Sequence, residues 1–135
     1  PDEAPLLGFV SAVGALVAMG NAVVAMPSER WPILATDLYQ VMETSDVPKG
    51  VVNIVTGLRK EIVPTLAAHD DVNGIWHFGS QREGEEVERL SVGNMKRTWV
   101  SLGKHLDWWN DTETGGEPFL REAIQWKNIW VPYGE

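Results

Sequence analysis

In this sequence, apolar runs of strand length alternate with segments whose apolar residues have helical spacing. This alternation constrains the fold more than any other feature of the chain. Ala22–Met26 is an unbroken apolar run, which is typical of a strand covered on both faces. Further strands are predicted at residues 51–55, 73–78 and 95–101. Apolar residues three and four apart predict helices over residues 5–19, 33–42, 59–68 and 81–91. This alternation predicts an α/β fold, a three-layer αβα sandwich with a mostly parallel sheet.

The alternation stops after Gly103. Residues 105–116 are polar and are expected to form an irregular connection, followed by a short helix over 118–124. Trp126–Val131 predicts a last strand, with Trp126, Asn128 and Trp130 on one face and Lys127, Ile129 and Val131 on the other. We therefore expect one domain over residues 1–104, and a connection and C-terminal strand over 105–135 that pack on it or on a partner.

Composition excludes several classes of function. The chain has no cysteine, so it supplies no disulfide, thiolate metal ligand or thiol nucleophile. A net charge of -8 makes nucleic acid an unexpected partner. The uncharged span from Ala4 to Ser28 is long enough to cross a bilayer, but Gly8, Gly14, Gly20 and Asn21 interrupt it. A buried helix leading into a buried strand explains this span more simply, so no membrane partner is expected.

Several motifs resemble one known family. Gly20-Asn21-Ala22-Val23-Val24, Pro27-Ser28-Glu29 and Pro48–Gly57 are followed by Asp71–Ser80, Asn94-Met95-Lys96 and Leu102-Gly103. In this order they are similar to the coenzyme-binding domain of NAD(P)-dependent aldehyde dehydrogenases, over about residues 5–104. The resemblance implies a Rossmann-like sheet whose ligands lie beyond the carboxyl ends of the strands. It also implies a parent enzyme that oxidises aldehydes to acids through a cysteine thiohemiacetal.

The coenzyme-binding residues implied by the resemblance are only partly present. Glu29 matches the glutamate that holds the ribose hydroxyls, but Met26 replaces its partner lysine, and a thioether donates no hydrogen bond. This loss would cost about 1.5–3 kcal/mol of binding free energy. Arg59 and Val63 stand where the family has glycines, and Phe78 stands where it has a small hydroxyl. Gly79 and Ser80 remain usable, so Glu29, Gly79 and Ser80 form the vestigial cofactor site.

The catalytic residues implied by the resemblance are missing. Ser101 replaces the glutamate base, and an ordinary hydroxyl cannot deprotonate a thiol or water at neutral pH. No cysteine nucleophile and no catalytic domain follow in this chain, and we expect no catalytic residue in it. These losses, with residues 1–11 and 127–135, are most similar to the degenerate second copy of the family-sixteen branch of aldehyde dehydrogenases.

Other clusters have simpler explanations. His69-Asp70-Asp71 is a polar turn without ligand spacing, so no metal site is expected. Ser101, His105 and Asp107 lack the glycines of a nucleophile elbow. The acidic run from Glu83 to Glu88 is typical of a solvated helix face.

The surplus of tryptophan in the last third of the chain has two interpretations. The tryptophans there are Trp99, Trp108, Trp109, Trp126 and Trp130. They could pack in the core, or they could form an interface in which Trp126, Ile129 and Trp130 contact a partner. An isolated chain with such a surface would self-associate.

Three functions remain open. The first is a structural and oligomerisation part of a cytoplasmic aldehyde dehydrogenase, with no cofactor bound to this segment and NAD or NADP in the parent. The second is a regulatory domain that still binds a dinucleotide. The third is a fragment of an active aldehyde dehydrogenase.

Overall fold

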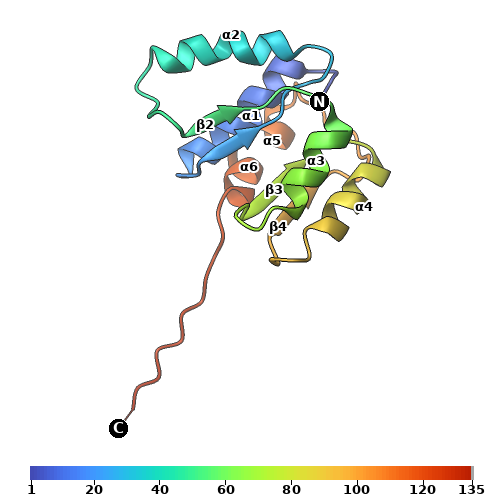
Figure 1. The fold of residues 1–135 in the computed structure, drawn as a ribbon. Coiled ribbons are helices and arrows are strands. Elements are labelled where there is room, and N and C mark those ends of the chain that lie inside the picture. Colours follow the sequence, from blue (N-terminus) through green and yellow to red (C-terminus); the bar gives the residue numbers. More distant parts are fainter. Residues whose placement is uncertain (135) are drawn as a thin grey trace.

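The computed structural model describes residues 1–134 as alternating helices and short parallel strands, followed by an extended C-terminal segment (Figure 1). The elements are α1 (Pro5–Ala18), β1 (Val23–Ala25), α2 (Pro32–Glu43), β2 (Val52–Ile54), α3 (Arg59–Ala68), β3 (Gly74–His77), α4 (Gln81–Leu90), β4 (Arg97–Val100), α5 (Asp111–Thr114) and α6 (Gly116–Glu122). Each helix and strand predicted before Gly103 is present within a few residues of its expected position. None of the helices among residues 1–134 is both long enough and apolar enough to cross a membrane.

The strands form two separate sheets. β1 pairs with β2 in parallel, with Val23 opposite Val52, and β3 pairs with β4 in parallel, with Gly74 opposite Arg97. Among residues 1–134 no hydrogen-bonded ladder joins the two pairs. The parallel pairing is as predicted, but the single continuous sheet is not formed, because β1 and β3 do not pair with each other.

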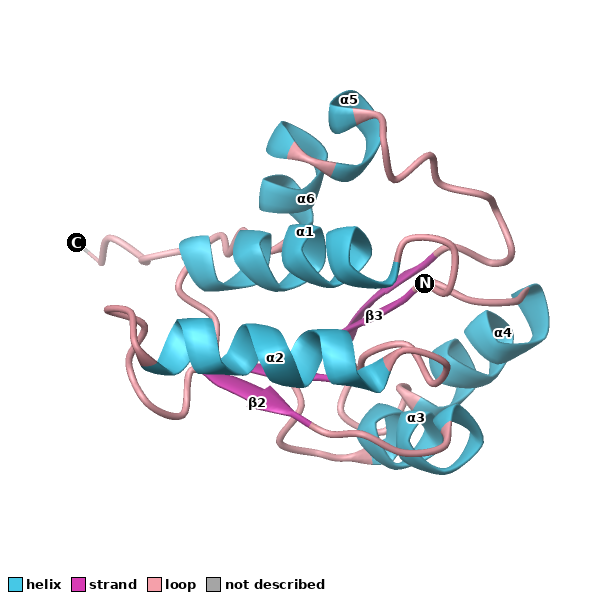
Figure 2. Ribbon diagram, turned by 90° about the horizontal axis from the view of Figure 1, so that it is seen from above, coloured by secondary structure: helices cyan, strands magenta, loops and turns pink. Residues whose placement is uncertain are grey.

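Helix α1 packs against both sheets. Its residues Phe9 and Val13 lie in one hydrophobic cluster with Val23, Ala25 and strand β2. Its residues Leu7, Ala12 and Ala15 lie in a second cluster, which includes Trp76 on β3 and Trp99 on β4. Figure 2 shows α1 between α2 and the α5–α6 pair. One helix therefore covers the same side of both strand pairs.

The opposite face of the β3–β4 pair is covered by α3 and α4. Ala67 on α3, Ile75 on β3 and Val87 on α4 form a third buried cluster. Helices consequently lie on both faces of these two strands.

An aromatic cluster attaches residues 105–123 to the rest of the fold. It consists of Trp76, Phe78, Trp99, Trp108 and Phe119, with ring centroids 4.7–6.4 Å apart. The connection that the sequence predicted to be irregular contains the short helix α5. Asn110 begins this helix, because its side-chain oxygen accepts a hydrogen bond from the Thr112 backbone N–H at 3.1 Å.

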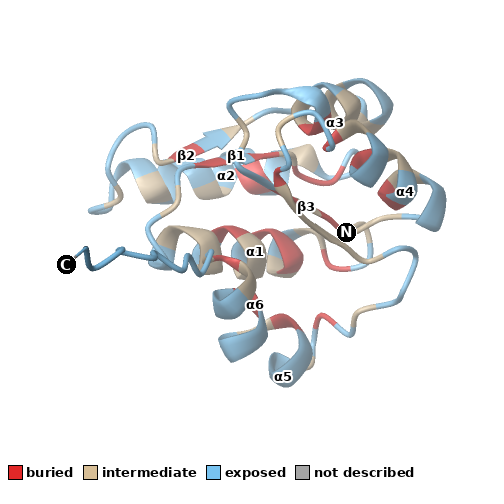
Figure 3. Ribbon diagram, turned by 90° about the horizontal axis from the view of Figure 1, so that it is seen from below, coloured by how far each residue is buried: buried red, intermediate tan, exposed pale blue. Residues whose placement is uncertain are grey.

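The predicted C-terminal strand does not form within this chain. Residues 123–134 contain no helix or strand, and the segment after α6 leaves the body of the molecule (Figure 1). Residues 125–134 of this segment are exposed, as the colouring of the C-terminal segment in Figure 3 shows. Trp126, Ile129 and Trp130 are 86%, 85% and 90% exposed. A strand needs a paired neighbour, and no strand within residues 1–134 pairs with this segment, so pairing of this segment with a partner stays a prediction.

Candidate functional site

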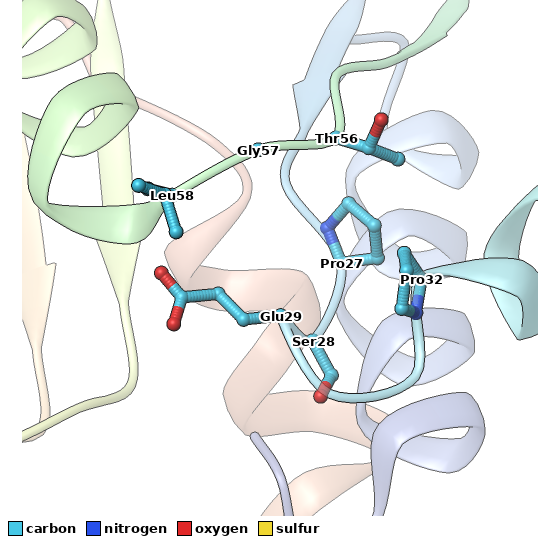
Figure 4. A pocket seen from close by; sticks show the side chains of 7 residues that line it. All are labelled: Pro27, Ser28, Glu29, Pro32, Thr56, Gly57 and Leu58. Atoms are coloured by element: carbon cyan, nitrogen blue, oxygen red, sulfur yellow. The ribbon is translucent and has the colours of Figure 1, made fainter.

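The carboxyl ends of β1 and β2 border a hollow of about 340 Å³. It is lined by Pro27, Ser28, Glu29, Pro32, Thr56, Gly57 and Leu58 (Figure 4). The segments that form it follow directly after parallel strands, which is where ligands bind in open α/β sheets. Of the predicted cofactor residues, Glu29 lines this hollow, whereas Gly79 and Ser80 lie outside it, after β3.

The carboxylate of Glu29 is already bonded within the chain. It accepts a hydrogen bond from the backbone N–H of Arg59, the first residue of α3. A carboxylate near a helix N-terminus is favoured by the unpaired N–H groups of the first turn. The acceptor that the resemblance assigns to a ribose is therefore used to join the loop after β1 to helix α3.

The N-terminus of α4 is capped by the side chains of Ser80 and Glu83. Ser80 Oγ accepts a hydrogen bond from the Glu83 backbone N–H at 3.3 Å. The Glu83 carboxylate in turn accepts from the Ser80 N–H at 2.9 Å and from the Ser80 hydroxyl at 2.7 Å. This reciprocal pair is a capping box. It places a carboxylate at the helix terminus where an anionic ligand would otherwise bind.

Arg59 connects the loops at the carboxyl ends of the strands. Its guanidinium lies 3.7 Å from the Asp2 carboxylate and 4.0 Å from the Glu83 carboxylate. Asp2 also accepts a hydrogen bond from the Ser28 hydroxyl at 2.5 Å. The hydrogen bond from Ser28 has the largest effect and lowers the pKa of Asp2. Burial opposes it, and the charge of Arg59 lowers the pKa further. The edge is thus a network of internal ion pairs and hydrogen bonds.

His77, the last residue of β3, is buried beside this network. Its Nε2 has no hydrogen-bond partner within the described chain and lies 3.9 Å from Glu83 Oε2. Burial lowers the pKa of His77, against the opposing effect of the Glu83 charge. A Cβ at Gly79 would lie 2.5 Å from this Nε2 and 2.8 Å from Glu83 Oε2. Gly79 therefore leaves space for the packing of His77 and Glu83.

Other substitutions singled out in the sequence have different structural roles. The ring of Phe78, which stands where the family has a small hydroxyl, packs in the aromatic cluster, 5.3 Å from Trp99 and 5.3 Å from Trp108. Val63 packs in the cluster between α3 and α4. Ser101 Oγ bonds to both the N–H and the C=O of Gly79, each at 3.2 Å. Through these hydrogen bonds, Ser101 holds the loop after β3 against the end of β4.

Residues 1–134 contain no metal-binding or triad geometry. No group of three His, Asp or Glu side chains is close enough to hold a metal ion in this part of the chain. Ser101 bonds to Gly79 rather than to His105 or Asp107. The roles of Asp2 and Glu83 at the carboxyl ends of the strands were not predicted from the sequence. The Ser80-x-x-Glu83 spacing is a recognisable capping-box signal, whereas nothing local marks Asp2.

The buried His77 gives a specific pH dependence. Because burial holds its pKa below the ordinary 6.5, the unfolded chain takes up the proton first as the pH falls. The free energy of unfolding should therefore fall below about pH 6.5, by at most about 1.4 kcal/mol per pH unit for this one group. Urea unfolding across pH 5 to 8 measures it, and His77→Gln should flatten the profile.

The matched control for this prediction is His105→Gln, since the His105 side chain is exposed. The lowered pKa values of Asp2 and Glu83 affect the free energy of unfolding in a separate, more acidic pH range. Burial tends to raise the pKa of Glu83, but the hydrogen bonds from Ser80 and the charge of Arg59 together lower it. Their stabilisation is present above about pH 4.5 and lost below it. An unchanged profile for His77→Gln would contradict the role assigned to His77.

Parallel strands that alternate with helices, with loops that meet at the carboxyl ends of the strands, define a domain of the α/β class. A family model described as "Aldehyde dehydrogenase family" matches residues 1–106. The chain therefore belongs to the aldehyde dehydrogenase family, which confirms the resemblance seen in its motifs.

Relatives and solved structures agree with this assignment. The chain is 36% identical over 104 residues to the NADP/NAD-dependent aldehyde dehydrogenase PuuC of Escherichia coli strain K12, which covers 76% of this chain and 21% of PuuC. An aldehyde dehydrogenase of Alternaria alternata is 28% identical over 132 residues, 97% of this chain and 26% of that protein. The structure of PnpE from Pseudomonas sp. WBC-3 has a TM-score of 0.73 and 35% identity, over 76% of this chain and 21% of that chain. The chain thus spans about a fifth to a quarter of these proteins.

Proposed function

We propose that this chain is a non-catalytic, structural part of an NAD(P)-dependent aldehyde dehydrogenase. The observation that carries the proposal is that Glu29 and Ser80, which are expected to face a coenzyme, already form hydrogen bonds to other groups of this chain. Glu29 is bonded to the backbone of Arg59, and the N-terminus of α4 is closed by Ser80 and Glu83. Met26 removes a donor, Ser101 replaces the base, and the chain has no cysteine. This pattern is similar to the degenerate second copy of the family-sixteen branch.

The structural role would be exercised through the C-terminal segment. Residues 125–131 are extended and exposed, and they carry apolar side chains on both of the faces that a strand would present. A strand of this kind can extend the sheet of a partner. The partner is the rest of a longer parent chain or a second copy, in a cytoplasmic protein whose cysteine-free composition needs no oxidising compartment.

Coenzyme titration tests the proposal. NAD+ and NADP+ are titrated against the fluorescence of the seven tryptophans, with isothermal calorimetry as a second readout. We expect no saturable signal below about millimolar ligand, because the lost lysine alone costs about ten- to a hundredfold in affinity. Met26→Lys should recover little. The triple variant Met26→Lys, Arg59→Gly, Glu83→Val removes two members of the network of ion pairs and hydrogen bonds. It should bind NAD+ or NADP+ more tightly than Met26→Lys alone.

Two alternatives have specific support. The hollow beside Glu29 favours a regulatory domain that still binds a dinucleotide, and saturation of the unaltered chain at micromolar NAD+ or NADP+ would establish it over the structural role. The alignment with the Alternaria protein, which extends over nearly the whole chain, favours a fragment of an active enzyme. Aldehyde oxidation by a longer form of the chain that depends on its own cysteine would establish this second alternative.

A further inference from the structure

Asn73, the residue before β3, carries a side-chain amide that has no hydrogen-bond partner among residues 1–134. The residue is also exposed to solvent. In four other asparagines the side-chain nitrogen donates to an oxygen of the chain at 2.7–3.2 Å; these are Asn21, Asn53, Asn94 and Asn110. The Asn73 amide is therefore free to turn toward the backbone of the residue that follows it.

That following residue is Gly74, and the fold does not require a glycine there. Within residues 1–134, Gly74 is not among the glycines with positive φ. A Cβ at Gly74 would lie 3.5 Å from the backbone oxygen of Arg97, which is ordinary van der Waals contact. Glycine is also unfavourable within a strand. Its local effect is that no side chain shields the backbone nitrogen of residue 74.

Strand pairing holds only one side of the Asn73-Gly74 peptide. The C=O of Asn73 accepts a hydrogen bond from the Arg97 N–H at 3.2 Å. Because successive residues of a parallel strand point their backbone groups to alternate edges, the N–H of Gly74 faces away from β4. The Gly74 nitrogen is thus not held by β4, and the Asn73 amide next to it is unbonded.

We propose that Asn73-Gly74 is a site of intramolecular deamidation, which converts Asn73 to aspartate and isoaspartate. The Gly74 nitrogen gives its proton to solvent and attacks Cγ of Asn73, so a C–N bond forms and a succinimide ring closes. The Cγ–Nδ2 bond breaks, and Nδ2 leaves as ammonia with a proton from solvent. Water then opens the ring at one of its carbonyl carbons. The net reaction consumes water, releases ammonia and involves no oxidation or reduction.

The two products have different effects on the backbone. Opening of the ring at Cγ gives aspartate with a normal backbone. Opening at the backbone carbonyl gives isoaspartate, in which the chain runs through Cβ and Cγ and is longer by a methylene. The former backbone carbonyl, which bonds to the Arg97 N–H, becomes a free carboxylate. The Arg97 side chain also holds the end of α6, because it donates to the Ile124 C=O and lies 2.6 Å from Glu122.

Isoaspartate at position 73 therefore loosens the amino end of the β3–β4 pair and, through Arg97, the attachment of α6. Asn128 is the natural comparison within the chain, because it is also exposed but is followed by Ile129. The β-branched side chain of Ile129 crowds the nitrogen that would attack. This inference concerns the start of β3 and does not depend on whether a coenzyme binds.

Incubation of the 135-residue chain at mildly alkaline pH tests the proposal. Samples taken over several weeks are digested, and mass spectrometry measures the conversion of each asparagine to the acid. We expect Asn73 to react at least about tenfold faster than Asn128. Gly74→Ala should reduce the rate at Asn73 to that of Asn128 or below, and the ordinary contact of its added Cβ with Arg97 allows this variant to fold.

The effect on strand pairing is measured on the isoaspartate form, which is isolated by chromatography. Amide hydrogen exchange at Arg97 should be at least about tenfold faster in this form than in the unaltered chain, because the bonded carbonyl of residue 73 is displaced. Asn73→Asp is the matched control, since it adds the negative charge with a normal backbone. It should change the exchange at Arg97 by less than about twofold.

Three results would overturn the proposal. The first is an Asn73 rate no higher than that of Asn128, and the second is an unchanged Asn73 rate in Gly74→Ala. The third is an isoaspartate form in which Arg97 exchanges as slowly as in the unaltered chain. If Gly74→Ala does not fold by circular dichroism, the comparison of Asn73 with Asn128 in the unaltered chain decides.

Discussion

Replacing Phe119 with alanine is expected to lower the free energy of unfolding by about 3–5 kcal/mol. Phe119 is 1% exposed and lies at the centre of the aromatic cluster, with ring centroids 4.9 Å from Trp99 and 5.6 Å from Trp76. Its removal leaves a cavity among large, rigid rings that cannot easily close around it. A loss of this size is a large fraction of the stability of an ordinary domain. Urea unfolding followed by circular dichroism measures it.

Leu120→Ala is the matched control for this substitution, because Leu120 is the next residue of α6 and is 37% exposed. It should cost less than about 1 kcal/mol. If Phe119→Ala were as mild as Leu120→Ala, residues 105–123 would not be an integral part of the fold. The domain would then end near residue 104, as the sequence analysis expected.

Ending the chain after Ile124 is expected to abolish self-association while changing the free energy of unfolding by less than about 1 kcal/mol. The removed segment contains the exposed side chains of Trp126, Ile129 and Trp130. Burial of such side chains between copies would favour association, whereas each copy folds without them. Sedimentation velocity over a range of protein concentrations measures the change.

Point variants distinguish a specific interface from non-specific hydrophobic association. Trp126→Ser and Trp130→Ser should each weaken association. Trp109→Ser is the matched control, since Trp109 is also 80% exposed but lies outside the C-terminal segment. An equal effect of all three substitutions would indicate non-specific hydrophobic contact. A chain of 135 residues that stays monomeric at every concentration would remove the support for a second copy as the partner.

The candidate site was only partly predictable. Glu29 and Ser80 were identified from motifs, because a family motif fixes which residue follows which strand. The bond between Glu29 and the Arg59 backbone was not predicted, because it depends on where α3 packs, whereas the Ser80–Glu83 capping box is local and could have been recognised. Phe78 shows the limit most clearly: its position in the motif was correct, but its ring turns toward Trp99 and Trp108, a direction that depends on residues far along the chain.

The sequence by itself determined the order and type of the elements up to Gly103, because hydrophobic periodicity and capping residues are local properties of the chain. It also determined the absence of cysteine and the changes at Met26 and Ser101. Only the tertiary structure decided that the strands divide into two pairs and that Phe119 packs at the centre of the aromatic cluster. It also left residues 125–131 unpaired. Strand pairing and aromatic packing depend on contacts between segments distant in sequence, and no local pattern specifies which edges meet.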